Sequence, residues 1–458
     1  MKRRSGAVAG VFRLHGVVTA ALWWLLVLTV SPLGAAEPDW PQVERRALEF
    51  LQQYLRIQSI NPPADTADAA ALIKAELERN GLVPKLYESG PTGQTNLVVR
   101  LRGRDASKKP LLLLNHMDVV PVDEKAWNID AFGGVIRDGQ IWGRGALDMK
   151  GLGVQQLMAL IALHNAGIVP SRDIVMLATA DEESGGARGI QWMIANHYAD
   201  IDAEYVLDEG GMGSRNALAA NRLVFGIPVG DKVPIWLRLR ATGTAGHGSQ
   251  PIPDNANDIL LEAIRRATAV PPGGSSHPVV EEMRRAIGHE LAQNKYMAAI
   301  QRNTISLTTL AAGVGSPLKP NVIPSTSEAT LDCRVLPGVD PNQFIAELKA
   351  RIDDARVTVE VINVSPDPGV SSIDTPLYSA MRATILKHHP DAIVTPMIVP
   401  HGTDSAYLHK RGMIKYGFTP MILDMATAAT MHSDQERIPV DEFLKGIRIF
   451  YELLASEF

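Results

Sequence analysis

The stretch Leu111-Leu-Leu-Leu-Asn-His-Met-Asp118 decides the fold class of this chain. Four leucines in a row are typical of a strand buried inside a sheet, and a histidine and an aspartate follow where that strand ends. In open α/β sheets, ligands collect at the carboxyl ends of the strands. The stretch therefore predicts a buried strand that carries functional side chains at its end.

Three further carboxylate clusters stand at similar places along the chain. An apolar run at 174–178 precedes Asp181-Glu182-Glu183, and a second run at 205–207 precedes Asp208-Glu209. Asp148 lies in a glycine-rich turn before a helical pattern. Because each cluster follows a strand or a tight turn, we expect the four clusters to meet at one edge of a sheet.

The order of the elements predicts two domains. Helical patterns at 150–166 and 187–196 alternate with the apolar runs, and this predicts a doubly wound α/β/α domain over residues 37–226. Strand, helix, two strands, helix and strand follow within 227–364, which is the order of an α+β ferredoxin-like unit. Helical and strand signals return at 365–458. We therefore predict a first domain that is interrupted by an inserted one.

Residues 1–36 are predicted to be a signal peptide. Four cationic residues within the first 13 positions precede an uncharged apolar run at 17–30, and small residues follow up to Ala36. Charge, apolar run and small residues in this order are typical of a cleaved export signal. The mature protein is then expected to be secreted or periplasmic. An uncleaved membrane anchor is the alternative, because the apolar run is only slightly shorter than a membrane span.

Composition excludes some classes of function. Charged residues make up 21% of the chain, the formal net charge is −5 and no basic run stands out, so nothing predicts nucleic-acid binding. The single cysteine, Cys333, lies in an alternating strand-like run. We predict a small core residue there and not a catalytic thiol.

The residue types of the clusters indicate a metal site. Carboxylates and imidazoles with few thiols suit Zn²⁺, with Co²⁺ or Mn²⁺ as alternatives. One ion needs three or four protein ligands and this chain offers more, so the surplus predicts two ions that share a bridging carboxylate. Such pairs cleave amides and esters with an activated water.

Within the clusters, neighbouring residues can divide the work. If one glutamate of the pair at 182–183 binds a metal, the other can act as the general base, and the Asp118 carboxylate is placed to orient His116. Each cluster also has a plainer interpretation when it is taken alone. Residues 116–118 would suit a surface turn, Asp148 a helix N-cap, and the acidic run at 181–183 a solvated loop.

Together the motifs resemble the M20 family of metallopeptidases. His-x-Asp at 116–118, Gly-Arg-Gly-x-x-Asp-x-Lys-Gly at 143–151 and Asp-Glu-Glu-x-x-Gly at 181–186 occur in this order, and the resemblance extends over 41–458. It implies an amide hydrolase for small peptides or N-acyl amino acids, of the exopeptidase or aminoacylase type. It also implies two Zn²⁺ ions with these ligands: His116, Asp148, Glu183, Asp208 or Glu209, and His432.

The resemblance also implies roles. Asp148 would bridge the two ions, Glu182 would be the catalytic base, and Asp118 would orient His116. At the fourth cluster the family uses either position, and the resemblance slightly favours Glu209 over Asp208.

The inserted unit resembles the family's lid or dimerisation domain, which implies a homodimer. His247, in Ala-Gly-His-Gly-Ser, matches a histidine that steadies the tetrahedral oxyanion, often from the partner subunit. Asn321 and Arg334 resemble the contacts to the substrate carboxylate, and Gly402-Thr403 the loop beside the substrate. His401 departs from the glycine of many members.

Two alternative functions stay open. A non-catalytic peptide- or metal-binding protein on this fold would have no need of the base Glu182. A lidless dinuclear aminopeptidase would lack both the inserted unit and His247.

Overall fold

The computed structural model describes residues 37–458 apart from 270–276, 289–290, 366 and 368. The predicted signal peptide at 1–36 lies outside the described residues. Within the described part of the chain, no helix combines the length and the apolar character that a bilayer crossing requires.

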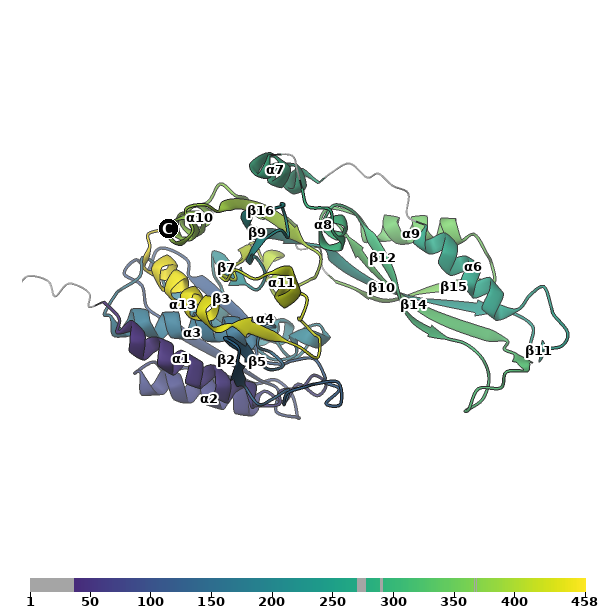
Figure 1. Cartoon of the computed structure of the whole chain (residues 1–458), viewed down its shortest axis with the longest axis horizontal. Helices are drawn as coiled ribbons and strands as arrows, with labels where there is room; N and C mark the ends of the chain where they lie inside the picture. Colours follow the sequence, from purple (N-terminus) through teal and green to yellow (C-terminus); the bar gives the residue numbers. More distant parts are fainter. Residues whose placement is uncertain (1–36, 270–276, 289–290, 366, 368) are drawn as a thin grey trace, which may run out of the picture. The chain divides into compact units, whose positions relative to one another are not determined.

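A six-stranded sheet forms the centre of the first domain (Figure 1). Its strand order is β1-β2-β6-β3-β7-β17, so the four-leucine strand β3 (Leu111–His116) lies inside it. Its two neighbours, β6 (Ile174–Thr179) and β7 (Tyr205–Asp208), run in the same direction, and so does β17 (Ile414–Gly417), which pairs with β7. The hairpin of β1 (Lys85–Glu88) and β2 (Thr95–Leu101) adds an antiparallel edge.

Helices cover both faces of this sheet. Leu111 and Leu113 pack into a core with α1 (Trp40–Leu55), α2 (Ala67–Arg79), α3 (Lys150–Asn165) and α13 (Val440–Ala455). Leu112 and Leu114 pack into a second core with α4 (Ile190–Asn196), α5 (Tyr198–Ile201) and α11 (Ser405–His409). Successive side chains of a strand point to opposite faces, so four consecutive leucines require cover on both sides. The predicted α/β/α layering is confirmed.

Helix α3 is buried on every side, and this explains why the sequence after Asp148 is mostly apolar. Its residues 150–163 are all buried, and α1 and α13 both pack against it. A helix that is hydrophobic all round belongs in the core of a domain. The turn that carries Asp148 is therefore attached to one of the most deeply buried elements of the protein.

A second, three-stranded sheet has the order β16-β9-β8. Its strands are β16 (Ile393–Val399), β9 (Leu223–Asp231) and β8 (Gly213–Arg215), and it joins the core of the first domain together with α10 (Pro376–His388). β9 runs across the limit expected after residue 226. Helix α7 (Pro278–Ile287) packs against β16, although its sequence falls inside the expected inserted unit. The domain limits stay a prediction.

The inserted unit has the predicted order of strand, helix, two strands, helix and strand. Its sheet is antiparallel with the order β12-β14-β10-β15. The strands are β10 (Val233–Thr242), β12 (Thr304–Ala311), β14 (Thr326–Val335) and β15 (Val357–Val364). Helices α6 (Ala256–Thr268) and α9 (Pro341–Ile352) share its core, which contains Cys333, and α7 and α8 (Lys295–Ile300) intervene before β12. The α+β ferredoxin-like unit is confirmed.

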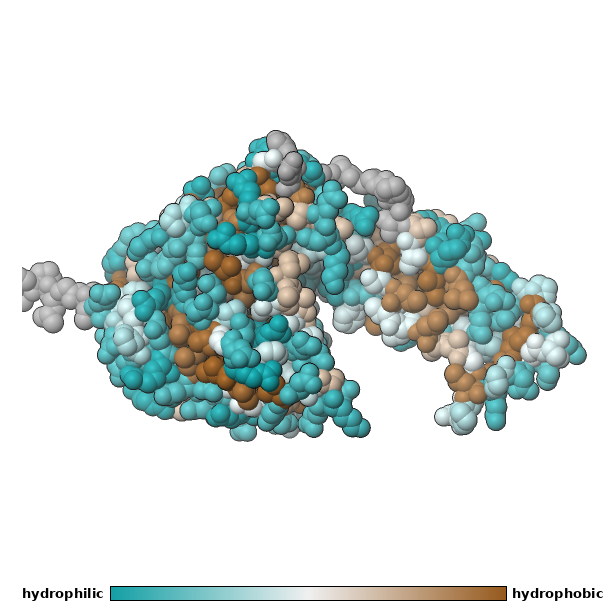
Figure 2. All heavy atoms as spheres, viewed as in Figure 1, coloured by the Kyte–Doolittle hydropathy of each residue, from teal (hydrophilic) through white to brown (hydrophobic). Residues whose placement is uncertain are grey.

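The other face of this inserted sheet carries a mixture of apolar and charged side chains. Trp236 is exposed there, and Arg238 and Glu360 form an ion pair across neighbouring strands. On the face shown in Figure 2, hydrophilic residues cover most of the surface and apolar residues gather in groups. A short ribbon of β11 (Gly246–His247) and β13 (Val322–Ile323) extends from the unit.

Candidate metal centre

The predicted ligand clusters meet at the carboxyl ends of the parallel strands. His116 ends β3, and Glu183 lies in a 3-10 turn directly after β6. Glu209 follows β7, and Asp148 precedes α3. Among the described residues, two groups bring their ligand atoms within 4.8 Å of one another: His116, Asp148 and Glu183, and His116, Glu182 and Glu209.

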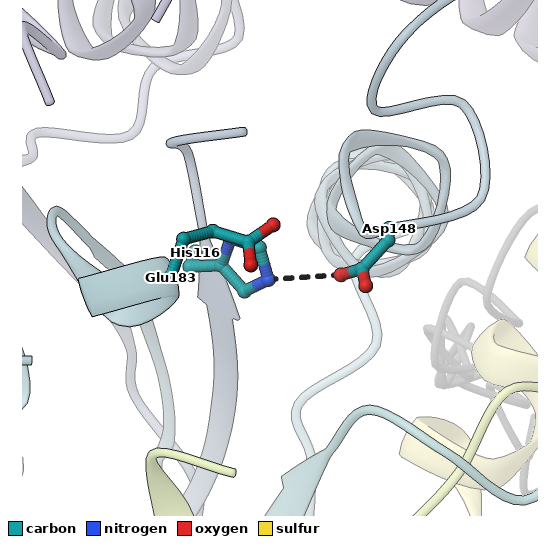
Figure 3. Close-up of side chains that lie close together, drawn as sticks. All are labelled: His116, Asp148 and Glu183. Carbon is teal, nitrogen blue, oxygen red and sulfur yellow. Dashed lines mark hydrogen bonds and ion pairs between the residues drawn. The ribbon is translucent and has the colours of Figure 1, made fainter. Parts of the chain in front are cut away.

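Asp148 lies between two imidazoles. Its Oδ1 is 3.1 Å from His116 Nε2, which Figure 3 marks, and its Oδ2 is 3.0 Å from His432 Nε2. Glu183 Oε1 is 3.4 Å from the same His432 nitrogen. Each oxygen of one carboxylate therefore faces a different histidine, which is the arrangement that a ligand shared by two cations requires.

The charges of this cluster shift the pKa values of its members. Burial raises the pKa of Asp148, but the hydrogen bonds and charges of His116 and His432 outweigh burial and hold it well below its ordinary value. The contact with the Asp148 carboxylate, and after it the nearby Glu183 carboxylate, raises the pKa of His432 to about 10. Burial raises the pKa of Glu209 well above the usual range, and the charge of Asp148 adds to this effect. Carboxylates this crowded require compensating cations.

The residues present fit divalent cations. Glu183 Oε1 is buried and has no hydrogen-bond partner, although buried polar atoms are normally satisfied. The donors are imidazole nitrogens and carboxylate oxygens, a set that suits Zn²⁺ and also Co²⁺ or Mn²⁺. His116, Asp148 and Glu209 would surround one position, and Asp148, Glu183 and His432 the other.

The fourth cluster separates its two carboxylates. Asp208 accepts hydrogen bonds from the backbone N–H of Glu209 at 2.8 Å and of Ser405 at 3.0 Å. Glu209 instead has an oxygen 4.0 Å from His116 Nε2 and belongs to one of the metal-sized groups. The geometry therefore favours Glu209 as the ligand and gives Asp208 the task of holding the 402–405 loop.

Glu182 projects into the same space as the ligands. It belongs to the group with His116 and Glu209 and lines a cavity of about 720 Å³ together with Asp148 and Glu183. Burial raises the pKa of Glu182 well above its ordinary value; the charge of His116 opposes this and that of Asp404 adds to it. A carboxyl group with a raised pKa beside a metal position can accept and return a proton.

Asp118 holds more than the ring of His116. The acceptor nearest to His116 Nδ1 is the backbone carbonyl of Asp118, at 3.0 Å, whereas a carboxylate oxygen lies at 3.5 Å. The carboxylate accepts the backbone N–H groups of Glu182 at 3.2 Å and Glu183 at 3.1 Å. Asn61 donates to it at 2.7 Å. Asp118 thus fixes the turn that carries the general-base candidate.

The predicted substrate contacts fall into two places. Arg334, Gly402 and Thr403 line the cavity, where Arg334 pairs with Asp332 (Nε to Oδ1, 2.8 Å). His247 and Asn321 do not line it. They lie together on the β11–β13 ribbon, where His247 is exposed, with its Nδ1 2.8 Å from Ser249 Oγ, and Gly248 N–H donates to the Asn321 carbonyl at 2.8 Å.

Three supporting residues were not assigned a role by sequence reasoning: Asn61, Arg144 and Glu436. Arg144 stands in the quoted 143–151 motif, and Glu436 follows His432 by four residues, so proximity to a ligand was the available signal. Asn61 is 57 residues from Asp118 and carries no such signal. His401, the departure from the family pattern, lines the cavity, and burial lowers its pKa.

The chain is similar to known proteins over most of its length. Porcine aminoacylase-1 (Sus scrofa) is 31% identical over 419 residues, which cover 90% of this chain and 95% of that protein. The probable carboxypeptidase S-like 2 of Dictyostelium discoideum is 30% identical, over 79% of this chain and 74% of that protein. The M20 family metallo-carboxypeptidase Sso-CP2 of Sulfolobus solfataricus superposes with a TM-score of 0.68 at 21% identity, covering 89% of this chain and 98% of that one.

The sequence model of peptidase family M20/M25/M40 matches residues 112–456, which is well over half of the chain. This range includes each ligand candidate from His116 to His432 and the whole inserted unit. The chain therefore belongs to peptidase family M20/M25/M40 and is a hydrolase of amide bonds.

Proposed function

We propose that this protein is an exported two-zinc hydrolase that removes the acyl or aminoacyl group from a small substrate with a free carboxylate. N-acyl amino acids and small peptides are the substrate class, as in aminoacylases and carboxypeptidases. The observation that carries the proposal is that Glu182 shares one cavity with Asp148, Glu183, Glu209 and His432. The inserted unit argues against a lidless aminopeptidase.

The reaction follows from the placement of these groups. Two Zn²⁺ ions, when bound, would polarise the scissile carbonyl and promote ionisation of the attacking water. Glu182 takes the proton from that water and returns it to the leaving nitrogen, which departs as a neutral amine. Asp118 supports both steps because it holds the backbone of the turn on which Glu182 stands.

Arg334 is proposed to bind the substrate carboxylate. It lines the cavity on the side of the inserted sheet, and a guanidinium can grip a carboxylate with two parallel hydrogen bonds. Asp332 holds the guanidinium at 2.8 and 3.0 Å. The Gly402-Thr403 loop faces the same space, and Asp231 accepts a hydrogen bond from Thr403 Oγ1 at 3.2 Å. Substrates whose carboxylate is amidated should therefore be poor.

His247 is proposed to stabilise the oxyanion from the partner subunit of a homodimer. It is exposed on the β11–β13 ribbon, and it does not line the cavity of its own chain. Asn321 lies on the same ribbon and would reach the substrate with it. A two-fold dimer would supply both residues to each cavity by the same contact.

The proposal is tested with purified protein of known zinc content. N-acetyl amino acids, dipeptides and the C-terminal amides of both are incubated with wild type and with Glu182→Gln. We expect hydrolysis of the free acids, little hydrolysis of the amides, and loss of activity in Glu182→Gln with both metal equivalents retained. Metal binding without hydrolysis of any substrate would favour a binding protein instead.

Export is tested separately, by fractionating cells that produce the full chain. We expect mature protein outside the cytoplasm with an N-terminus near residue 37. Full-length protein in the membrane fraction would support the anchor alternative.

A further inference from the structure

A buried carboxylate outside the ligand set organises the turn that carries Asp148. Glu436 Oε1 accepts three backbone N–H groups, from Gly145 at 3.1 Å, Leu147 at 2.9 Å and Asp148 at 3.0 Å. The Glu436 side chain has no exposed surface. One oxygen thus fixes the backbone of three residues of a single turn, including the residue whose carboxylate lies between His116 and His432.

A small sheet brings Glu436 to this turn. β18 (Arg437–Pro439) pairs with β5 (Gln140–Trp142), which in turn pairs with β4 (Val135–Arg137). The backbone carbonyl of Glu436 extends the pairing by accepting Gly143 N–H at 3.1 Å. The position of the carboxylate is therefore set by strand pairing and not by a flexible loop.

Arg144 connects this carboxylate to the second ligand loop. Its Nη1 donates to Glu436 Oε2 at 2.5 Å, and its Nη2 donates to the backbone carbonyl of His432 at 3.3 Å. The Nη2 group also contacts the Pro121 carbonyl at 3.4 Å, and the guanidinium lies over the ring of Trp127. Arg144 is 3% exposed, so these contacts are made away from water.

His432 has a particular need for such a contact. Its backbone has a φ of 61°, in the left-handed region that non-glycine residues seldom adopt, at a cost of order 1 kcal/mol or more. Its side chain is about half exposed, so packing restrains it less than it restrains His116. The hydrogen bond from Arg144 to the His432 carbonyl therefore restrains the backbone of a residue that has an unfavourable φ and a half-exposed side chain.

Stability alone does not account for the pair. A buried ion pair is often no more stabilising than apolar residues of similar volume, because both charges must be removed from water. Beyond the pair itself, Arg144 Nη2 donates to the backbone carbonyl of His432, and Glu436 Oε1 accepts the backbone N–H groups of the turn that carries Asp148. This direction indicates a role in positioning.

We propose that Arg144 and Glu436 are positioning residues that set the separation of the two halves of the metal centre. Glu436 fixes Asp148, which both metal positions share. Arg144 additionally fixes His432, which belongs to one position only. Loss of the Arg144 fork, meaning the two Nη groups that contact Glu436 and the His432 carbonyl, should therefore weaken metal binding at one position selectively. Changes at Glu436 should weaken metal binding at both positions. This inference rests on the two-metal site of the proposed function.

The test is a stepwise metal titration of metal-free protein, with Zn²⁺ against a chromophoric chelator and with Co²⁺ followed by its visible absorption. Wild type should bind two equivalents; a single equivalent would contradict the proposed two-metal function itself. Arg144→Lys keeps a cation for Glu436 but removes the fork. We expect it to weaken one step by about 10- to 100-fold, the range for residues that orient metal ligands, and to leave the other nearly unchanged.

Two further variants complete the comparison. Arg46→Lys alters another ion pair with a buried glutamate, Glu76, outside the site, and should leave both steps unchanged. Glu436→Gln should weaken both steps and change the Co²⁺ spectrum of each. Equal weakening of both steps in Arg144→Lys, or no weakening in either, overturns the inference.

A double variant guards against loss of folding. Arg144→Met combined with Glu436→Gln removes both charges together and keeps a side-chain oxygen that can accept the backbone N–H groups of the turn, so no unpaired charge is left in the core. We expect this variant to fold with a lower thermal unfolding temperature than wild type and to bind metal more weakly in both steps. Wild-type metal affinity in this variant would show that the pair positions nothing.

Discussion

The floor of the cavity and the tip of the inserted unit carry the two halves of the predicted machinery, and they are held very differently. On the floor, buried carboxylates grip the backbone of the ligand turns: Asp118 holds Glu182 and Glu183, and Glu436 holds Asp148. At the tip, His247 is exposed and its ring contacts Ser249. In the proposed mechanism, the metal half of the site is preorganised within one chain, whereas the oxyanion half would depend on an approach from elsewhere.

Removal of metal from the floor of the cavity is expected to have the largest effect. Chelation should abolish amide hydrolysis, and added Zn²⁺ should restore it. Because cations bind the folded state, their removal should also lower the free energy of unfolding, by about 2.7 kcal/mol if the free metal had stood at 100 times its Kd. Activity assays and thermal unfolding measure both changes. Full hydrolysis by metal-free protein would contradict the two-metal interpretation.

Glu182→Gln removes the proposed general base from the floor of the cavity and should leave the geometry of the metal ligands unchanged. We expect kcat to fall by about 10²- to 10⁴-fold, because the amide cannot accept the proton of the attacking water. Zinc content and unfolding temperature should stay close to those of wild type. A matched control is Glu76→Gln, a buried glutamate on α2, which should lower stability and leave the kcat of the folded fraction unchanged. Activity retained in Glu182→Gln would remove Glu182 from the mechanism.

His247→Ala tests the tip. We expect a decrease in kcat of about 10²- to 10³-fold, the effect of removing one oxyanion donor, with metal content and stability unchanged because the ring is exposed. Ser249→Ala, at the same tip, should have a much smaller effect.

Mixing the two defective variants sharpens the same comparison. If His247 acts across a dimer, chains with Glu182→Gln and chains with His247→Ala should regain up to about a quarter of wild-type activity after subunit exchange, because half of the mixed dimers' sites combine intact residues. No recovery in exchanged dimers would favour closure of the unit within one chain.

The smallest expected effect concerns the core of the inserted unit. Cys333 is buried, and burial raises the pKa of its thiol to about 12. The thiolate is the reactive form and a raised pKa depletes it, so the folded protein should react very slowly with a disulfide reagent at pH 8. Denaturant should expose the thiol and accelerate the reaction. Rapid labelling of the native protein would show that this core opens far more readily than the floor.

The parts of the molecule that sequence predicts are those with local signals. The four leucines of β3 are themselves the signal for a buried strand, and the carboxylates after β6 and β7 lie within a few residues of an apolar run. The sheet brings these segments together as expected. The alternation along β10 and β14 likewise predicts the inserted sheet, because burial on one face gives a period of two.

The parts that sequence could not predict depend on pairings between distant residues. Glu436 follows Arg144 by 292 residues, and no periodic pattern indicates that the two meet. Helix α7 looks like part of the inserted unit from its place in the chain, yet its apolar face packs against β16 of the first domain. Asp118 was expected to bond mainly to His116, but two backbone N–H groups lie closer to its carboxylate because β6 ends beside β3.

The long separation between Arg144 and Glu436 also has a consequence for the order in which the protein is made. Synthesis delivers His116, Asp148, Glu183 and Glu209 early, but β18 and the residue that locks the Asp148 turn emerge only after the whole inserted unit. Contacts of such long range form late, since closing a large loop costs entropy before any contact repays it. A nascent chain would thus contain most of its metal ligands while lacking the Glu436 contacts that fix the turn of Asp148. High-affinity metal uptake should coincide with the docking of the C-terminal segment.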